Sequence, residues 1–355
     1  MTGRPGGVGL GTLAGRLTAR DRWLLRMVHE HSVLTTTQLH RLGWAGTLRQ
    51  VQGRARALRE YEVLDGFRPL RPYGHGSHPV HLVLGPVGAH VLAAEAGVTV
   101  TDLGYRGRTR ALTIAHRLSL GHDVGVTDLV CDLATTPGVV VVRWWSARRC
   151  GRYFGHLTRP DAYLALTTPN DTHTGGGPGA RGAGAGVGGW WEMFLEYDTG
   201  SENLSQLTAK VAGYHALAEH TGVVTPVGVW FTRPGREPSA RRALTDALRA
   251  LPSPGRVPIL TGAPTSPPGQ GAASSGARTG AGGRTWLPLH PGQVERVDFA
   301  TLATPRPHLP PASPGPGDTP DVGSGANPGS DPGGPLPAPS PYPPRPHGAH
   351  PGRTS

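Results

Sequence analysis

Hydrophobic residues in the first sixty positions recur three and four apart, the spacing of helices that bury one face. Thr18-Ala-Arg-Asp21, a capping threonine with an acid three residues later, predicts a first helix over residues 18–31. Threonines also cap a second short helix that ends at Leu42 and a third that begins after Thr47. Because the third helix has an apolar inner face and an arginine-rich outer face, these two helices predict a helix-turn-helix.

After the third helix the apolar pattern changes to the two-residue period of strands. Residues 63–67 and 80–84 are strand-like and flank a Gly/Pro-rich loop over 68–77. A helix-turn-helix followed by two strands and such a loop predicts a winged-helix domain, which we place at residues 17–97.

A second pattern of helices and strands begins at residue 109 with a long amphipathic helix. Further along the chain there are strand-like runs and helical segments in the order 139–145, 159–166, 190–198, 201–220 (helix), 226–231 and 239–251 (helix). The resulting order α-β-β-β-α-β predicts an α/β domain with a mixed sheet over residues 109–251.

Stretches rich in glycine and proline interrupt these patterns. The chain of 355 residues has 54 Gly and 37 Pro, and its hydrophobic fraction is only 37%. Such stretches do not bury enough apolar surface to fold. We therefore expect flexible or disordered segments at 1–16, 169–189, 252–283 and 304–355, with 284–303 returning to the α/β domain as an edge element.

The charge of the chain is concentrated in the predicted winged helix. The net charge is +11, and residues 1–110 hold fifteen Arg against seven acidic residues. A basic excess of this kind is typical of proteins that bind a polyanion, here double-stranded DNA. A GC-rich coding bias would also enrich arginine, and the single lysine, Lys210, is the exception to that bias.

The side chains placed to contact DNA lie on the third helix and in the wing. Arginine, glutamine and threonine can hydrogen-bond to base edges or to phosphates. The candidates are Thr47, Arg49, Gln50, Arg54 and Arg56 on the helix, and Arg68 and Arg71 in the wing. The alternative is a winged helix that contacts proteins, with a solvated arginine face.

The cysteine content and the apolar runs of the sequence indicate the cellular compartment of the protein. Cys131 and Cys150 are too few for a disulfide framework or a zinc site, which favours a reducing compartment. The sequence contains neither an apolar run long enough for a membrane span nor the apolar core of a signal peptide. We expect a cytoplasmic protein that does not contact the membrane.

Acidic residues in the second domain are candidate ligands of a catalytic metal ion. Asp161 and Glu196 lie on consecutive predicted strands, whose antiparallel pairing would bring both carboxylates to one Mg²⁺ ion, and Asp198 faces the same way as Glu196. Lys210, on the following helix, could orient a water molecule or neutralise charge on a phosphate. The predicted metal ligands are Asp161, Glu196 and Asp198, and the predicted catalytic residues are Asp161, Glu196 and Lys210. The alternative is that these are ordinary solvated strand and helix residues.

Five segments carry a resemblance to a known family. They are Leu17-Thr-Ala-Arg-Asp21, Val33-Leu-Thr-Thr-Thr-Gln-Leu39, Arg159-Pro-Asp161, Phe194-Leu-Glu-Tyr-Asp-Thr-Gly-Ser-Glu202 and Leu207-Thr-Ala-Lys-Val-Ala-Gly-Tyr214. In this order they resemble the replication-relaxation proteins of actinobacterial and other plasmids and integrative elements. The resemblance implies a role in plasmid replication or DNA relaxation, with replication or transfer proteins as partners.

The second domain also resembles the PD-(D/E)XK nuclease fold in its element order and acidic pair. By that resemblance Asp161 and Glu196 would hold the metal of an endonuclease. The departure is that the usual Glu-x-Lys reads Glu196-Tyr197-Asp198, so Lys210 would have to replace the lysine.

Two functions follow from these features. The chain is either a mobile-element protein that binds DNA and nicks it with Mg²⁺, or a non-enzymatic DNA-binding regulator or scaffold whose nuclease-like domain is degenerate.

Overall fold

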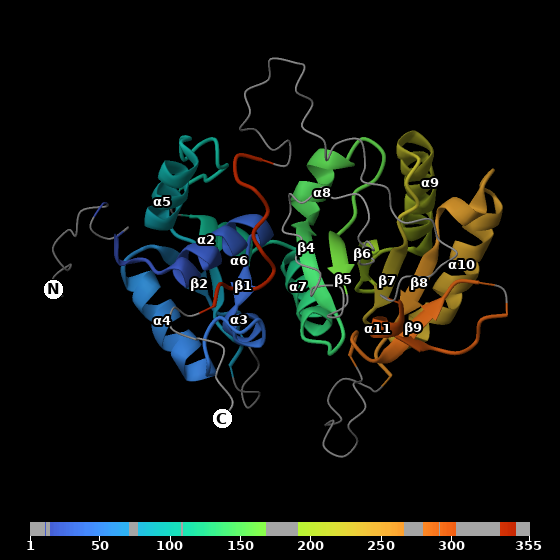
Figure 1. The fold of residues 1–355 in the computed structure, drawn as a ribbon, viewed down its shortest axis with the longest axis horizontal. Coiled ribbons are helices and arrows are strands. Elements are labelled where there is room, and N and C mark those ends of the chain that lie inside the picture. Colours follow the sequence, from blue (N-terminus) through green and yellow to red (C-terminus); the bar gives the residue numbers. More distant parts are fainter. Residues whose placement is uncertain are drawn as a thin grey trace, which may run out of the picture. The chain divides into compact units, whose positions relative to one another are not determined.

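A computed structural model describes residues 11, 15–70, 77–107, 109–167, 191–265, 280–290, 292–302 and 334–345 (Figure 1). These residues form two compact units. Unit 1 covers residues 1–124 together with 329–355, and unit 2 covers residues 125–328. The overall class is the predicted mixture of helices with a mixed sheet, accompanied by a small antiparallel sheet.

Unit 1 combines helices with three short strands. Its elements are α2 (Ala19–His31), β1 (Leu34–Thr35), α3 (Thr36–Arg41), α4 (Leu48–Glu60), β2 (Leu64–Phe67), β3 (His81–Leu84), α5 (Pro86–Ala96) and α6 (Arg110–Ala115). The three strands form an antiparallel sheet in the order β1-β3-β2. The sequence pattern predicted α2, α3, α4, β2 and β3, whereas the two-residue strand β1 is too short to show a period.

Three helices of unit 1 begin in the same way. In each, a threonine hydroxyl accepts the backbone N–H of the third helical residue. The side-chain oxygen of that third residue in turn accepts the backbone N–H of the threonine. The pairs are Thr18 with Asp21, Thr35 with Gln38 and Thr47 with Gln50. The helix starts are therefore set by local sequence.

The helix predicted to open the second domain at residue 109 is two helices, α6 and α7 (Leu120–Ala134). Ala111 and Ile114 of α6 share an apolar cluster with Val33 and Val83, so α6 belongs to unit 1. The division between the units falls inside α7, after Val124. The prediction failed here because helical spacing does not reveal which core a face packs against.

Unit 2 is built on a sheet of seven described strands in the order β10-β9-β8-β7-β6-β5-β4. The strands are β4 (Val140–Ser146), β5 (Ala162–Thr167), β6 (Trp191–Asp198), β7 (Val227–Phe231), β8 (Ile259–Gly262), β9 (Arg284–Pro288) and β10 (Val297–Asp298). The pairs β6–β7 and β7–β8 are parallel and the others are antiparallel. The mixed sheet is as predicted, with more strands than the sequence pattern indicated.

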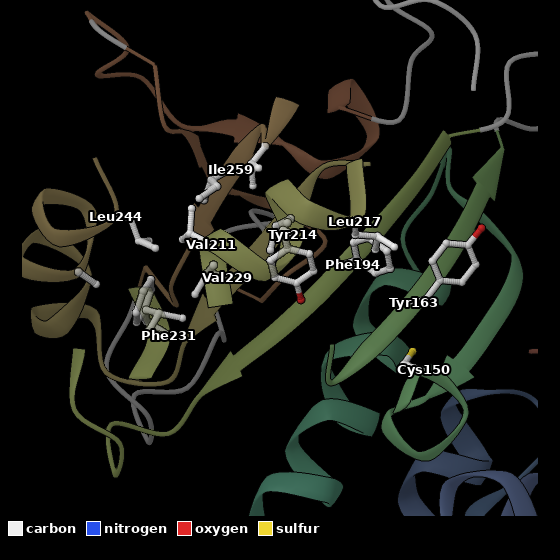
Figure 2. Close-up of a cluster of buried hydrophobic side chains, with 14 of the residues drawn as sticks. Cys150, Tyr163, Phe194, Val211, Tyr214, Leu217, Val229, Phe231, Leu244 and Ile259 are labelled. Carbon is white, nitrogen blue, oxygen red and sulfur yellow. The ribbon is translucent and has the colours of Figure 1, made fainter. Parts of the chain in front are cut away.

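The helices of unit 2 cover both faces of this sheet. They are α7 from Gly125 onward, α8 (Ala147–Tyr153), α9 (Leu204–Thr221), α10 (Glu237–Arg249) and α11 (Phe299–Leu302), with one-turn helices at Pro234–Arg236 and Pro254–Arg256. Helices α9 and α10 pack on one face, where Val211 and Tyr214 meet Phe194, Val229 and Phe231 of the strands (Figure 2). On the other face the ring of Tyr197 lies against α7, so alternate residues of β6 serve different cores.

A buried ion pair joins α10 to the end of the sheet. Glu237 is 2% exposed, and its carboxylate accepts hydrogen bonds from Arg296 at 2.5 Å and from the Thr261 hydroxyl at 2.7 Å. Arg296 precedes β10, so this ion pair links α10 to the end of the sheet formed by β9 and β10.

Two segments expected to lack structure are partly ordered. Residues 259–262 form β8 in the middle of the sheet, although they lie inside the predicted linker 252–283. A four-residue run, Ile259–Gly262, is too short for periodicity to distinguish from a loop. Residues 334–345 of the predicted tail pack on unit 1. The insertion 169–189 and Arg71 lie outside the described residues.

Gly213 allows α9 to approach the rest of unit 2. A Cβ at this position would meet the Leu157 carbonyl oxygen, whereas one at Gly151 of α8 would meet nothing within 4 Å. We expect Gly213→Ala to lower the free energy of unfolding by about 1–3 kcal/mol. Gly151→Ala, the matched control, should be neutral or stabilise by up to about 1 kcal/mol. Urea unfolding measures both, and equal effects would contradict the close approach.

Candidate functional site

The outer face of α4 carries a stripe of exposed polar side chains. Residues three, four and seven apart lie on one side of a helix. Arg49, Gln52, Arg56 and Arg59 follow that spacing and all are exposed. Within the described part of the chain, Arg49 and Arg56 form no ion pair. Neither Gln52 nor Arg59 was among the predicted DNA contacts, although the same spacing from Arg49 would have found both.

Two predicted base contacts have another partner. The Thr47 hydroxyl accepts the Gln50 N–H at 3.2 Å, and the Gln50 amide oxygen accepts the Thr47 N–H at 2.9 Å. Both residues are exposed, but these groups close the start of α4 on itself. They hold the helix start in place.

Arg54 binds a buried carboxylate. Its guanidinium donates to both oxygens of Asp21, at 3.0 and 2.5 Å, and Asp21 is 1% exposed. Burial alone would raise the pKa of Asp21, but the hydrogen bonds from Arg54 and Thr18 outweigh it and lower that pKa. Arg54 therefore fixes α4 against α2, a role that sequence spacing did not predict.

A second bridge fixes the turn before α4. The Arg20 guanidinium donates to the Trp44 carbonyl at 2.7 Å and also to the Gly43 carbonyl, while the Trp44 indole donates back to the Arg20 carbonyl at 3.0 Å. Of the two predicted wing residues, Arg68 is exposed just after β2, and Arg71 is not among the described residues.

In unit 2 the antiparallel pairing of β5 and β6 brings Asp161 beside Glu196. Asp161 donates its N–H to the Leu195 carbonyl at 3.0 Å, and its carboxylate accepts the Tyr197 N–H at 2.8 Å. Ala162 is paired with Leu195, so Asp161 and Glu196 come at neighbouring positions of the ladder.

Glu196 lies at the centre of this cluster and is 2% exposed. One carboxyl oxygen accepts a bond from the Lys210 ammonium at 2.5 Å and the other accepts one from the Tyr214 hydroxyl. Lys210 and Tyr214 are one turn apart on α9, the helix that Gly213 lets approach closely. Tyr214 was not predicted, although its spacing of four from Lys210 was a signal.

The electrostatics of the cluster follow from burial. Burial and the nearby Asp161 carboxylate raise the pKa of Glu196 to about 8, against the opposing influence of Lys210. Burial would lower the pKa of the Lys210 ammonium, but Glu196 and Asp161 outweigh it and raise that pKa. The cluster thus pairs one ammonium with two carboxyl groups, and burial makes Glu196 harder to ionise than a solvated glutamate.

Asp198 does not join the cluster. Its carboxylate accepts a bond from Arg236 Nε at 2.9 Å and one from the Gly200 N–H at 2.5 Å. It therefore fixes the chain at the end of β6 to the segment that precedes α10. No local pattern connects Asp198 with Arg236, because the two are 38 residues apart.

The residues described here do not fit a Mg²⁺ site. Both oxygens of Glu196 are engaged by Lys210 and Tyr214, and Asp198 is engaged by Arg236. In the described ranges no three His, Cys, Asp or Glu residues gather closely enough to hold a metal ion. Mg²⁺ requires several oxygen ligands in octahedral geometry.

A comparison with family models gives a match over more than half of the chain. The family described as replication-relaxation matches residues 25–232, from within α2 to the end of β7. The match includes both α4 and the Glu196 cluster. No curated protein and no solved structure matches the chain. Within the described residues, no helix combines the length and apolar character of a membrane span.

The raised pKa of Glu196 predicts how stability depends on pH. Because the folded state holds this proton more tightly than a solvated glutamate of pKa 4.5 does, the free energy of unfolding should fall as pH rises from 4.5 to about 8. In Glu196→Gln this contribution should be absent, so its stability should change less over that range. Urea unfolding at several pH values measures the difference.

The matched control is Glu295→Gln, at an exposed carboxylate of the same unit. It should retain the pH dependence of the unchanged protein. Parallel curves for Glu196→Gln and the unchanged protein would mean that Glu196 titrates as if solvated.

Proposed function

We propose that this chain, which belongs to the replication-relaxation family, binds double-stranded DNA through unit 1 during the replication or relaxation of a plasmid or mobile element. Membership of the family itself implies the role in replication or relaxation. The observation that carries the proposal of DNA binding is the exposed stripe Arg49, Gln52, Arg56 and Arg59 on α4.

The stripe suits the major groove of DNA. A guanidinium can donate two parallel bonds to a guanine or to a phosphate, and a glutamine side chain can do the same to an adenine. Arg49 and Arg56 are seven residues apart, so they lie on the same side of α4 about two turns apart. The partial positive charge at the N-terminus of α4 adds to the positive electrostatic potential of these arginines.

The helix is presented rigidly. Arg54 of α4 binds Asp21 of α2. Arg20, also on α2, binds the turn that precedes α4. A pre-organised recognition element loses less conformational freedom on binding. This supports DNA as the partner, because Arg49 and Arg56 stay exposed while Arg54 and Arg20 are engaged within the unit.

We further propose that unit 2 acts without a bound metal and that the protein is an accessory DNA-binding factor in the cytoplasm. The support is that Lys210 and Tyr214 occupy both carboxyl oxygens of Glu196, which leaves the nuclease-like element order without a usable set of ligands among the described residues. Such a protein requires a separate replication or transfer enzyme to act on the DNA.

Removing two cations of the stripe should weaken binding. The double variant Arg49→Ala/Arg56→Ala should bind a labelled duplex roughly 10-fold or more weakly at moderate salt, and its salt slope should fall by about 2 because two phosphate contacts are lost. Fluorescence anisotropy over a salt series measures both values.

The control for charge is Arg242→Ala/Arg249→Ala, two exposed arginines of α10 in unit 2. It lowers the net charge equally and should leave binding nearly unchanged. Equal losses in the two double variants would mean that binding depends on total charge and not on α4. A protein that does not bind DNA even at low salt would exclude this function.

The same assignment predicts no cleavage. Supercoiled plasmid incubated with the protein and Mg²⁺ or Mn²⁺ should remain supercoiled under conditions where it is bound, because Glu196 is buried and engaged. Agarose gels measure this. Nicking by the unchanged protein that disappears in both Asp161→Ala and Lys210→Ala would instead support the endonuclease.

A further inference from the structure

Residues 334–345 form a proline-rich segment, Gly-Pro-Leu-Pro-Ala-Pro-Ser-Pro-Tyr-Pro-Pro-Arg, that packs with unit 1. It has neither helix nor strand. Chains so rich in proline favour an extended helix with three residues per turn. Leu336, Pro339 and Pro341 are buried, whereas Pro337 and Ser340 are exposed, so the segment has a buried side and an exposed side.

The segment is held by its backbone carbonyls. The Trp23 indole N–H donates to the Ser340 carbonyl at 2.7 Å, and Arg20 donates to the Pro344 carbonyl at 3.0 Å. Carbonyls of a proline-rich chain lack internal partners, because proline has no N–H and the extended helix has no internal hydrogen bonds. A tryptophan side chain suits such a chain, because its N–H can donate to a carbonyl and its apolar ring can pack against proline rings.

The two donors belong to α2 of the folded unit. Trp23 lies on α2 and is 5% exposed. Arg20 is held by the Gly43 and Trp44 carbonyls, which use its Nε and one terminal nitrogen and direct the other terminal nitrogen to Pro344. These contacts form a binding site for an extended peptide on α2 and the turn before α4.

We propose that Trp23 and Arg20 form a binding site for proline-rich peptides, and that the chain's own residues 334–345 occupy it in cis. The ligand class is an extended segment with an apolar residue three positions before a proline and with accepting carbonyls beyond it. A proline-rich partner must displace this segment to bind. The proposal does not depend on whether unit 1 binds DNA.

The test uses the full chain and a labelled synthetic peptide with the sequence of 334–345. Leu336→Asp places a charge on the buried side of the segment, and Pro337→Asp places the same charge on its exposed side. The peptide should bind the Leu336→Asp chain at least about 10-fold more tightly than the unchanged chain or Pro337→Asp, because in those two the attached segment competes at high effective concentration.

A second variant tests the contact itself. Trp23→Phe retains most of the ring but removes the donor, and in the Leu336→Asp background it should weaken peptide binding about 5-fold to 10-fold. The Trp23 indole N–H resonance, identified by its loss in Trp23→Phe, should shift in Leu336→Asp but not in Pro337→Asp.

Three results would overturn the proposal. The first is equal peptide binding to the unchanged, Leu336→Asp and Pro337→Asp chains. The second is no peptide binding to any of them together with an unmoved indole resonance. The third is dimerisation of the unchanged chain that Leu336→Asp abolishes, which would place the segment on a second copy and not in cis.

Discussion

The structure depends on the cost of removing a carboxylate from water. Asp21, Glu196 and Glu237 are 1%, 2% and 2% exposed, and each is matched with a cation from another element: Arg54, Lys210 and Arg296. A buried charge without a partner is strongly destabilising, whereas a paired and hydrogen-bonded one is tolerated. These pairs therefore determine which helix lies against which neighbour, α4 on α2 in unit 1 and α9 on the sheet in unit 2.

The same constraint separates side chains that are available to a partner from those that are engaged. The sequence makes Arg54 a candidate for DNA contact and Lys210 a candidate for catalysis. In the structure each of them neutralises a carboxylate of its own unit. Arg49 and Arg56, on the same helix as Arg54, do not face a buried acid and remain exposed. This difference carries the proposal that unit 1 holds DNA, and that the carboxylates of unit 2 support the fold.

Helix α2 connects these features within unit 1. Its first two turns carry Asp21, which positions α4, Arg20, which positions the turn before α4, and Trp23, which binds the proline-rich segment. One short stretch thus orients the proposed recognition helix and binds residues 334–345. Arg20 contacts both the turn and Pro344, so the proposed peptide site and the proposed DNA-binding helix share a residue.

The sequence by itself determined the helices with threonine caps, the order of the long strands and the neighbouring positions of Asp161 and Glu196. These features depend on residues close in the chain: a cap needs its third residue, a period needs one element, and consecutive strands readily pair. Only the tertiary structure decided the partners of Asp21, Asp198 and Glu237, which are 33, 38 and 59 residues away in the chain, as well as the place of β8 and the docking of residues 334–345. The physical reason is that burial is a property of the packed core, so which charges must pair becomes defined only when distant segments meet.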